Sequence, residues 1–212
     1  MGKRKIPLVA NCLYHIYSRA VPGTDAFKDP QDYNRFIKSL YFYCIEDRLP
    51  SFSFFLERKK EIPLFFNKSQ KHVSIHTYCL MPNHLHMILS SKETNGISMF
   101  LQKTLKSHSL YYNSRYKRKG HLWQGKFENI IIQTDEQLLH TIRYIHLNPV
   151  TAYLVDYPQQ WKYSSYKEYI ERPKLSLCNI PDTFYRNIDH LEFTKEAIEI
   201  QREKAKNKKL KP

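Results

Sequence analysis

The chain has 212 residues, of which 42% are hydrophobic and 14% aromatic, which is enough for one domain with additions or two small ones. Lysine and arginine exceed aspartate and glutamate by 34 − 20 = 14, and this surplus favours nucleic acid as a partner over incidental polyanion binding. The N-terminus lacks the apolar core of a signal peptide, and no stretch approaches the roughly 18 apolar residues of a membrane span. The 4 cysteines show no close spacing, so neither a zinc knuckle nor a redox pair is indicated. Cys12, Cys44 and Cys79 sit in apolar runs, and we expect them to be buried thiols of a cytoplasmic protein.

Hydrophobic periodicity and turn residues define the expected elements. Asp29 and Pro30 form a cap followed by proline at the first helical position, and Thr134 with Gln137 forms a capping box. We expect Pro149 to end or kink the last of the main helices. In chain order, the expected elements are a strand over residues 11–20, a helix over about 30–46, strands over 72–80 and 84–89, a helix over about 96–116, a strand over 127–133 and a helix over about 134–148.

This order, β-α-β-β-α-β-α, predicts an α+β protein with a ferredoxin-like split βαβ fold. In that topology the sheet is antiparallel, the first and third strands are central and pair with each other, and the helices cover one face. We expect a domain over residues 1–155, with an insertion at about 47–71 that carries two prolines and short apolar clusters. Residues 156–212 are expected to form a C-terminal helical extension that ends in a basic tail.

Two histidines on one predicted strand are the first indication of a site. Residues i and i+2 of a strand project from the same face, so His84 and His86 point one way and Leu85, Met87 and Leu89 the other. Two imidazoles aimed at one point begin a divalent-metal site. For an isolated pair of this kind, the simpler interpretation is two satisfied polar groups at a sheet surface.

The last main helix supplies groups that would complete such a site. Tyr144 lies off the apolar stripe of that helix, and Asn148 lies one turn further on the same face. If the helix packs beside the histidines, the Asn148 amide oxygen becomes a third ligand and the Tyr144 hydroxyl faces the metal. Imidazole and oxygen donors with open positions suit Mg²⁺ or Mn²⁺, although imidazoles also suit Zn²⁺. Taken singly, Tyr144 could equally be a packing aromatic.

Three motifs occur in order: MPN before the histidine pair, HLWQGKF at 121–127 and RYIHLNPV at 143–150. Together they resemble the single-tyrosine HUH transposases, above all the REP-associated tyrosine transposases and related small insertion-sequence transposases. The resemblance covers about residues 14–166 and is interrupted by the insertion. It implies that His84, His86 and Asn148 hold the metal and that Tyr144 is the nucleophile, which would take a DNA 5′-phosphate as a covalent phosphotyrosine.

Basic and aromatic residues between the second long helix and the fourth strand are the candidate DNA contacts. Trp123 could equally anchor the core, and each cation could equally be a solvated charge. The candidates are Arg115, Lys117, Arg118, Lys119, His121, Trp123, Gln124 and Lys126. The rival tyrosines Tyr111, Tyr112 and Tyr116 lie largely on the core-facing stripe of their helix and are expected to pack or stack rather than react.

The favoured function is therefore a metal-dependent DNA transposase that nicks and rejoins single-stranded or hairpin-flanked DNA. One alternative is a catalytically silent protein that binds DNA or RNA hairpins. Another is a zinc hydrolase, but Asn83 stands beside the histidine pair where a carboxylate base would be needed. The site could be complete within a monomer or shared across a homodimer.

Overall fold

The computed structural model describes residues 7–45, 52–57, 71–171, 173, 176–180 and 189–209. Most of the expected insertion, and residues 210–212 of the basic tail, lie outside this part of the chain. The elements in order are β1 (Leu13–Arg19), α1 (Pro30–Tyr43), α2 (Phe52–Glu57), β2 (Val73–Met81), β3 (His84–Ser91), α4 (Gly96–Arg115), β4 (Glu128–Ile132), α5 (Asp135–Thr151), a short 3₁₀ turn (Pro158–Gln160), α6 (Tyr166–Glu171), α8 (His190–Lys195) and α9 (Ile198–Lys209).

The strands form a four-stranded antiparallel sheet with the order β2-β3-β1-β4. The predicted α+β fold is confirmed, including the central pairing of the first and third strands. In the register of β1 against β3, Tyr17 lies opposite His86 and Arg19 lies opposite His84. The face of β3 that carries His84 and His86 is therefore extended by residues of the neighbouring strand β1.

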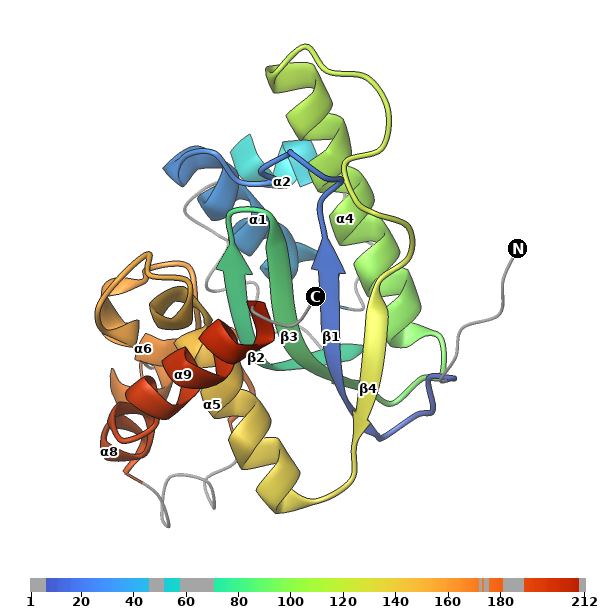
Figure 1. Ribbon diagram of the computed structural model, residues 1–212. Coiled ribbons are helices and arrows are strands. Elements are labelled where there is room, and N and C mark those ends of the chain that lie inside the picture. Colours follow the sequence, from blue (N-terminus) through green and yellow to red (C-terminus); the bar gives the residue numbers. More distant parts are fainter. Residues whose placement is uncertain are drawn as a thin grey trace.

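The two faces of the sheet bury different sets of side chains. On one face, Tyr14 and Ile16 of β1 and Leu85 and Met87 of β3 join the main core beneath α1 and α4. On the other face, a smaller cluster joins Ile88 to apolar residues of α5. Figure 1 shows α4 running behind β1 and β4, while α5 and the C-terminal helices gather beside β2. The first two long helices cover one face as expected, and α5 covers the other.

The predicted helix starts are confirmed by their caps. Asp29 accepts hydrogen bonds from the backbone N–H groups of Gln31 and Asp32, and Thr134 accepts one from Gln137. The prediction for the end of α5 is corrected: the helix passes through Pro149 and continues to Thr151. A proline so close to the helix end removes a single backbone hydrogen bond, and the Ala152 N–H still reaches the Asn148 carbonyl at 2.9 Å.

Residues beyond α5 cover the outer edge of β2. The Leu80 N–H donates to the Tyr163 carbonyl at 2.9 Å, and the Trp161 indole N–H donates to the Leu80 carbonyl at 3.0 Å. Isolated bridges join Ile75 to Cys178 and Cys79 to Ser164. A covered edge cannot pair with another strand. Part of the C-terminal extension is thus built onto the sheet, and α9 packs against α5.

The four cysteines are free thiols; Cys44 and Cys79 are buried as expected, but Cys12 is only half-buried. Among the described residues, no helix has the length and apolar character needed to cross a bilayer.

His108 is a titratable group inside the main core. It is fully buried on α4 among the rings of Phe27, Phe36 and Trp123, and its Nε2 donates to the Ala26 carbonyl at 2.8 Å. Burial lowers its pKa to about 4, so the folded protein holds it neutral.

Acid should therefore weaken the fold. Between about pH 6.5 and about pH 4 the unfolded chain binds a proton at His108 that the folded chain does not, so stability falls as pH falls, by up to about 1.4 kcal/mol per pH unit. His108→Gln, which keeps an N–H for Ala26, should reduce this slope in urea unfolding measured from pH 7 to pH 5. The exposed His121→Gln should leave it unchanged. Equal slopes for wild type and His108→Gln would contradict the prediction.

Candidate active site

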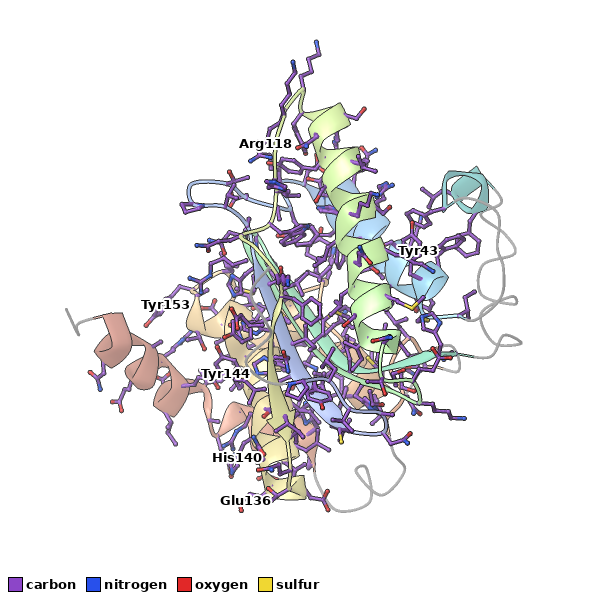
Figure 2. The ribbon with its side chains drawn as sticks, turned by 90° about the vertical axis from the view of Figure 1, so that its right-hand side faces the viewer. Tyr43, Arg118, Glu136, His140, Tyr144 and Tyr153 are labelled. Atoms are coloured by element: carbon purple, nitrogen blue, oxygen red, sulfur yellow. The ribbon has the colours of Figure 1, made fainter. Side chains whose placement is uncertain are left out.

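One cleft on the α5 side of the sheet contains the predicted metal ligands and nucleophile. Its walls are formed by β1, β3 and α5, and its volume is about 1010 Å³. His84 and His86 line it from β3, and Tyr144 and Asn148 line it from α5. Figure 2 shows Tyr144 on α5 beside the sheet, one turn from His140 and two turns from Glu136. A single chain brings all four side chains together.

The His84 ring is held by neighbours on both sides. Its Nδ1 lies 2.7 Å from the Asn83 Oδ1, which can only accept, so His84 donates there and its Nε2 carries no proton in the neutral ring. Burial, together with the nearby Arg19 charge, lowers the pKa of His84 to about 4, and a hydrogen bond with Asn148 acts in the opposite direction. A neutral ring with a bare Nε2 is the form that binds a metal.

The His86 ring stands next to that of His84, with the ring centroids 5.1 Å apart. It is buried, and burial together with the nearby His15, His84 and Arg19 lowers its pKa well below 6.5. Its Nδ1 lies 3.0 Å from the Nε2 of His15 on β1. Both histidines of the pair are therefore neutral and each has a partner at Nδ1.

The Asn148 amide is oriented by its own helix. Its Nδ2 donates to the Tyr144 carbonyl at 2.9 Å, which leaves Oδ1 available as an acceptor on a side chain that lines the cleft. Within the described ranges, no three His, Cys, Asp or Glu side chains form a group that could hold a metal ion. Two imidazole nitrogens and one amide oxygen, with room for water and phosphate oxygens, fit Mg²⁺ or Mn²⁺.

Tyr144 is accessible at the cleft rather than part of the core. It is 43% exposed, and its ring meets those of His86 and His15 edge-on, with centroid distances of 5.6 Å and 6.1 Å. Tyr17 of β1 lines the same cleft, with its ring centroid 6.0 Å from that of His86. The cleft thus contains two tyrosines, of which the sequence motifs indicate only Tyr144.

The rival tyrosines of α4 have structural roles, as expected. Tyr112 is buried, and the hydroxyls of Tyr111 and Tyr116 each donate to the Asp32 carboxylate, at 2.9 Å. Arg115 joins the same network through ion pairs to Asp29 at 2.6 Å and Asp32 at 2.8 Å. Arg115 therefore connects α4 to the start of α1, and we no longer count it among the candidate DNA contacts.

Trp123 is a core anchor. It is 7% exposed, and its indole N–H donates to the Leu105 carbonyl of α4 at 3.2 Å. These contacts favour core packing over base stacking as the role of Trp123.

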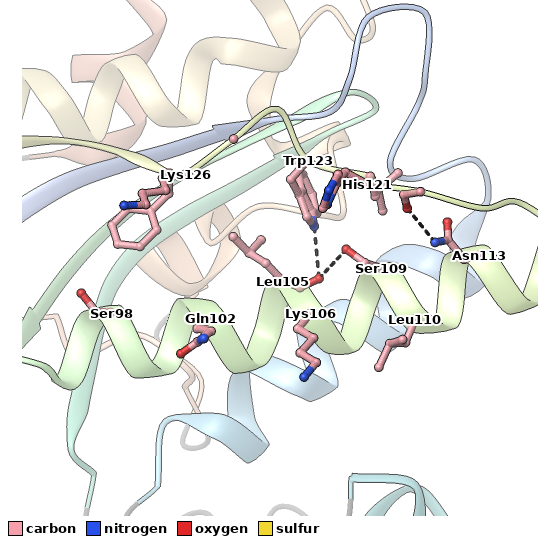
Figure 3. Close-up of a pocket in the computed structure, with 14 residues that line it drawn as sticks. Ser98, Gln102, Leu105, Lys106, Ser109, Leu110, Asn113, His121, Trp123 and Lys126 are labelled. Atoms are coloured by element: carbon pink, nitrogen blue, oxygen red, sulfur yellow. Dashed lines mark hydrogen bonds between the residues drawn. The ribbon is translucent and has the colours of Figure 1, made fainter. Parts of the chain in front are cut away.

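The other candidates surround a groove between α4 and the returning loop. Figure 3 shows Asn113 of α4 pointing toward the loop that carries His121 and Lys126, while the Lys106 side chain points away from that loop. Arg118 holds the loop through a 2.7 Å hydrogen bond to the His121 carbonyl. Lys117, Lys119 and Gln124 are exposed on the same loop. The Gln124 N–H donates to the Arg19 carbonyl at 2.8 Å, so this basic loop joins the sheet at the end where Arg19 borders the cleft.

The residues of β1 that line the cleft, His15, Tyr17 and Arg19, were not predicted. Their signal is the alternation of the first strand, which places all three on one face. The face that they share with the histidines follows only from the pairing of β1 with β3.

The model of a family described as "Transposase IS200 like" matches residues 55–148, which include the histidine pair, Tyr144 and Asn148. A protein of Haemophilus influenzae named as a REP-associated tyrosine transposase is 24% identical over 139 residues, or 60% of this chain and 79% of that protein. A solved structure of a REP-associated tyrosine transposase bound to a REP hairpin has a TM-score of 0.56 at 14% identity, over 89% of this chain and 96% of the other. Over that segment the chain is similar to the IS200-like transposases, and it is a distant homologue of the REP-associated tyrosine transposases, as the motifs indicated.

The network around Arg115 gives a test of its structural role. Arg115→Ala should lower the urea midpoint of unfolding, because the fully buried Asp32 carboxylate loses its cationic partner. Lys119→Ala, which removes an exposed cation a few residues away, should leave the midpoint within error. An unchanged midpoint for Arg115→Ala would return this residue to the candidate DNA contacts.

Proposed function

We propose that this protein is a metal-dependent DNA transposase that nicks and rejoins single-stranded DNA through a 5′-phosphotyrosine at Tyr144. The observation that carries the proposal is the cleft itself. His84, His86 and Asn148 each have one polar atom engaged by a neighbour, and the accessible Tyr144 ring lies edge-on to that of His86. That arrangement, together with the match of residues 55–148 to the IS200-like transposases, supports metal ligation by these three side chains and attack by Tyr144.

The proposed reaction conserves the energy of the DNA backbone. The Tyr144 oxygen attacks the phosphorus, the bond from phosphorus to the 3′-oxygen breaks, and that oxygen leaves as a 3′-hydroxyl after gaining a proton. The 5′-phosphate stays bonded to the tyrosine until another 3′-hydroxyl attacks it and restores the phosphodiester. Bound Mg²⁺ or Mn²⁺ would supply charge stabilisation for the phosphate oxygens. Arg19, which borders the cleft opposite His84, supplies a positive charge from the protein for the same phosphate.

We further propose hairpin-flanked DNA as the substrate. The net charge of +14, the exposed cations of the loop after α4 and the groove beside them suit a DNA backbone. The family relative of known structure that shares this fold was solved with a REP hairpin. We assign residues 1–155 to the catalytic domain and 156–212 to the C-terminal extension. Since one chain supplies all four proposed site residues, we propose that a monomer contains a complete site. A homodimer would then contribute to DNA binding rather than complete the site.

The covalent intermediate provides the direct test. Incubation with a hairpin oligonucleotide from the flanks of the gene and Mn²⁺ should yield a protein–DNA adduct that survives denaturing electrophoresis. Tyr144→Phe should slow adduct formation by at least about a thousandfold, because the ring remains but the nucleophilic oxygen is lost. Chelation of the metal with EDTA should have a comparable effect.

Tyr17→Phe is the matched control, since it removes a hydroxyl from the same cleft. It should retain the adduct. If Tyr17→Phe abolishes the adduct and Tyr144→Phe does not, the nucleophile is Tyr17. If wild type and Tyr144→Phe bind the hairpin equally and neither forms an adduct, the protein is the catalytically silent hairpin binder.

A further inference from the structure

His15 is a buried polar neighbour of His86 and has no role in the reaction described above. It lies on β1, diagonally across from His86, because the register pairs His15 with Ile88 and Tyr17 with His86. It is 9% exposed and lines the cleft. Its ring centroid is 5.1 Å from that of His86 and 6.1 Å from that of Tyr144. His15 therefore contacts one proposed ligand and the proposed nucleophile at once.

The contact between the two imidazoles limits where their protons can be. The His15 Nε2 and the His86 Nδ1 are 3.0 Å apart, so one nitrogen donates and the other accepts. If His15 donates, Nδ1 of His86 is the acceptor and the single proton of the neutral His86 ring is on Nε2. If His86 donates, its proton is on Nδ1 and its Nε2 carries only a lone pair. Only the second arrangement leaves His86 able to bind a metal through Nε2.

The Nδ1 of His84 also has a hydrogen-bonding partner, and that partner fixes which nitrogen of the His84 ring carries the proton. Its Nδ1 faces an amide oxygen, the Oδ1 of Asn83, at 2.7 Å. That oxygen accepts and cannot donate. Two rings of one strand face thus each have a partner at Nδ1, one from the adjoining turn and one from the neighbouring strand. Partners of this kind fix the tautomer and the orientation of metal-binding histidines.

We propose that His15 is a positioning residue that accepts the Nδ1–H of His86 and so holds the Nε2 of His86 bare for the metal. This inference rests on the proposed role of His86 as a ligand. A histidine accepts this proton without adding a negative charge to the cleft. A carboxylate at this position would place a buried negative charge beside Tyr144.

The tautomer can be measured on the wild-type protein with no metal and no DNA. Nitrogen-15 NMR of the full-length chain, with His15 and His86 signals assigned from single substitutions, should show the proton of His86 on Nδ1 and that of His15 on its own Nδ1. A proton on Nε2 of His86 would overturn the proposal.

Metal affinity provides the second measurement. His15→Phe keeps a ring beside Tyr144 but removes the acceptor, and should raise the Mn²⁺ dissociation constant about 10–100-fold. His15→Gln can place its Oε1 near the position of the lost nitrogen and should restore most of the affinity. Ile130→Ala is the matched control, because Ile130 pairs with His15 across the sheet and lines the cleft without a hydrogen-bonding side chain. Mn²⁺ binding as tight in His15→Phe as in wild type would overturn the proposal.

The results separate this inference from the proposed function. A His86 proton on Nδ1 with His15-dependent Mn²⁺ affinity supports the role of His15 even if no protein–DNA adduct forms. If adduct formation requires Tyr144 but Mn²⁺ affinity does not change on substitution of His15, the proposed transposase function is supported and the positioning role of His15 is refuted.

Discussion

The pairing register of β1 against β3 is the constraint on which the rest of the structure depends. These are the two central strands of the sheet, and alternate residues of each point to opposite faces. One face carries Tyr14, Ile16 and Met87 into the main core, and the other carries His15 and His86 into the cleft. A slip of one residue would bury the histidines and expose the core, so the free energy of the core also holds the site in place.

Rigid supports hold each group of the cleft. His84 and His86 stand on a central strand, and their Nδ1 atoms face partners from a turn and from β1. Tyr144 and Asn148 are one turn apart on α5, which an apolar cluster fixes to the same face of the sheet. The amide of Asn148 is oriented by the carbonyl of Tyr144, so the proposed nucleophile and the proposed third ligand share one stretch of backbone. A shift of α5 would move both together.

Much of this architecture could be predicted from the sequence because it depends on local patterns. The strand alternation, the cap at Asp29 and the histidine pair with Tyr144 and Asn148 are visible in short stretches of chain. The roles of Arg115 and Trp123 could not be predicted in this way, because they depend on contacts with residues that are distant in the sequence, Asp32 and Leu105. The partnership of His15 with His86 spans 71 positions and requires the strand register. The continuation of α5 past Pro149 depends on the packing of its last turn, where Val150 is buried beside Ala197 and Ile198 near the start of α9.

The cleft has no acidic side chain among the described residues that line it, and its formal charge comes from Arg19. A divalent cation held there by imidazoles and an amide would keep its whole charge, with no carboxylate to offset it. A DNA phosphate would then serve as the missing anionic ligand. Thermodynamic linkage makes such an effect mutual, so that DNA strengthens metal binding by the same factor by which metal strengthens DNA binding. Under the proposed function, an acid-free ligand set would couple the binding of the metal to the arrival of the DNA strand.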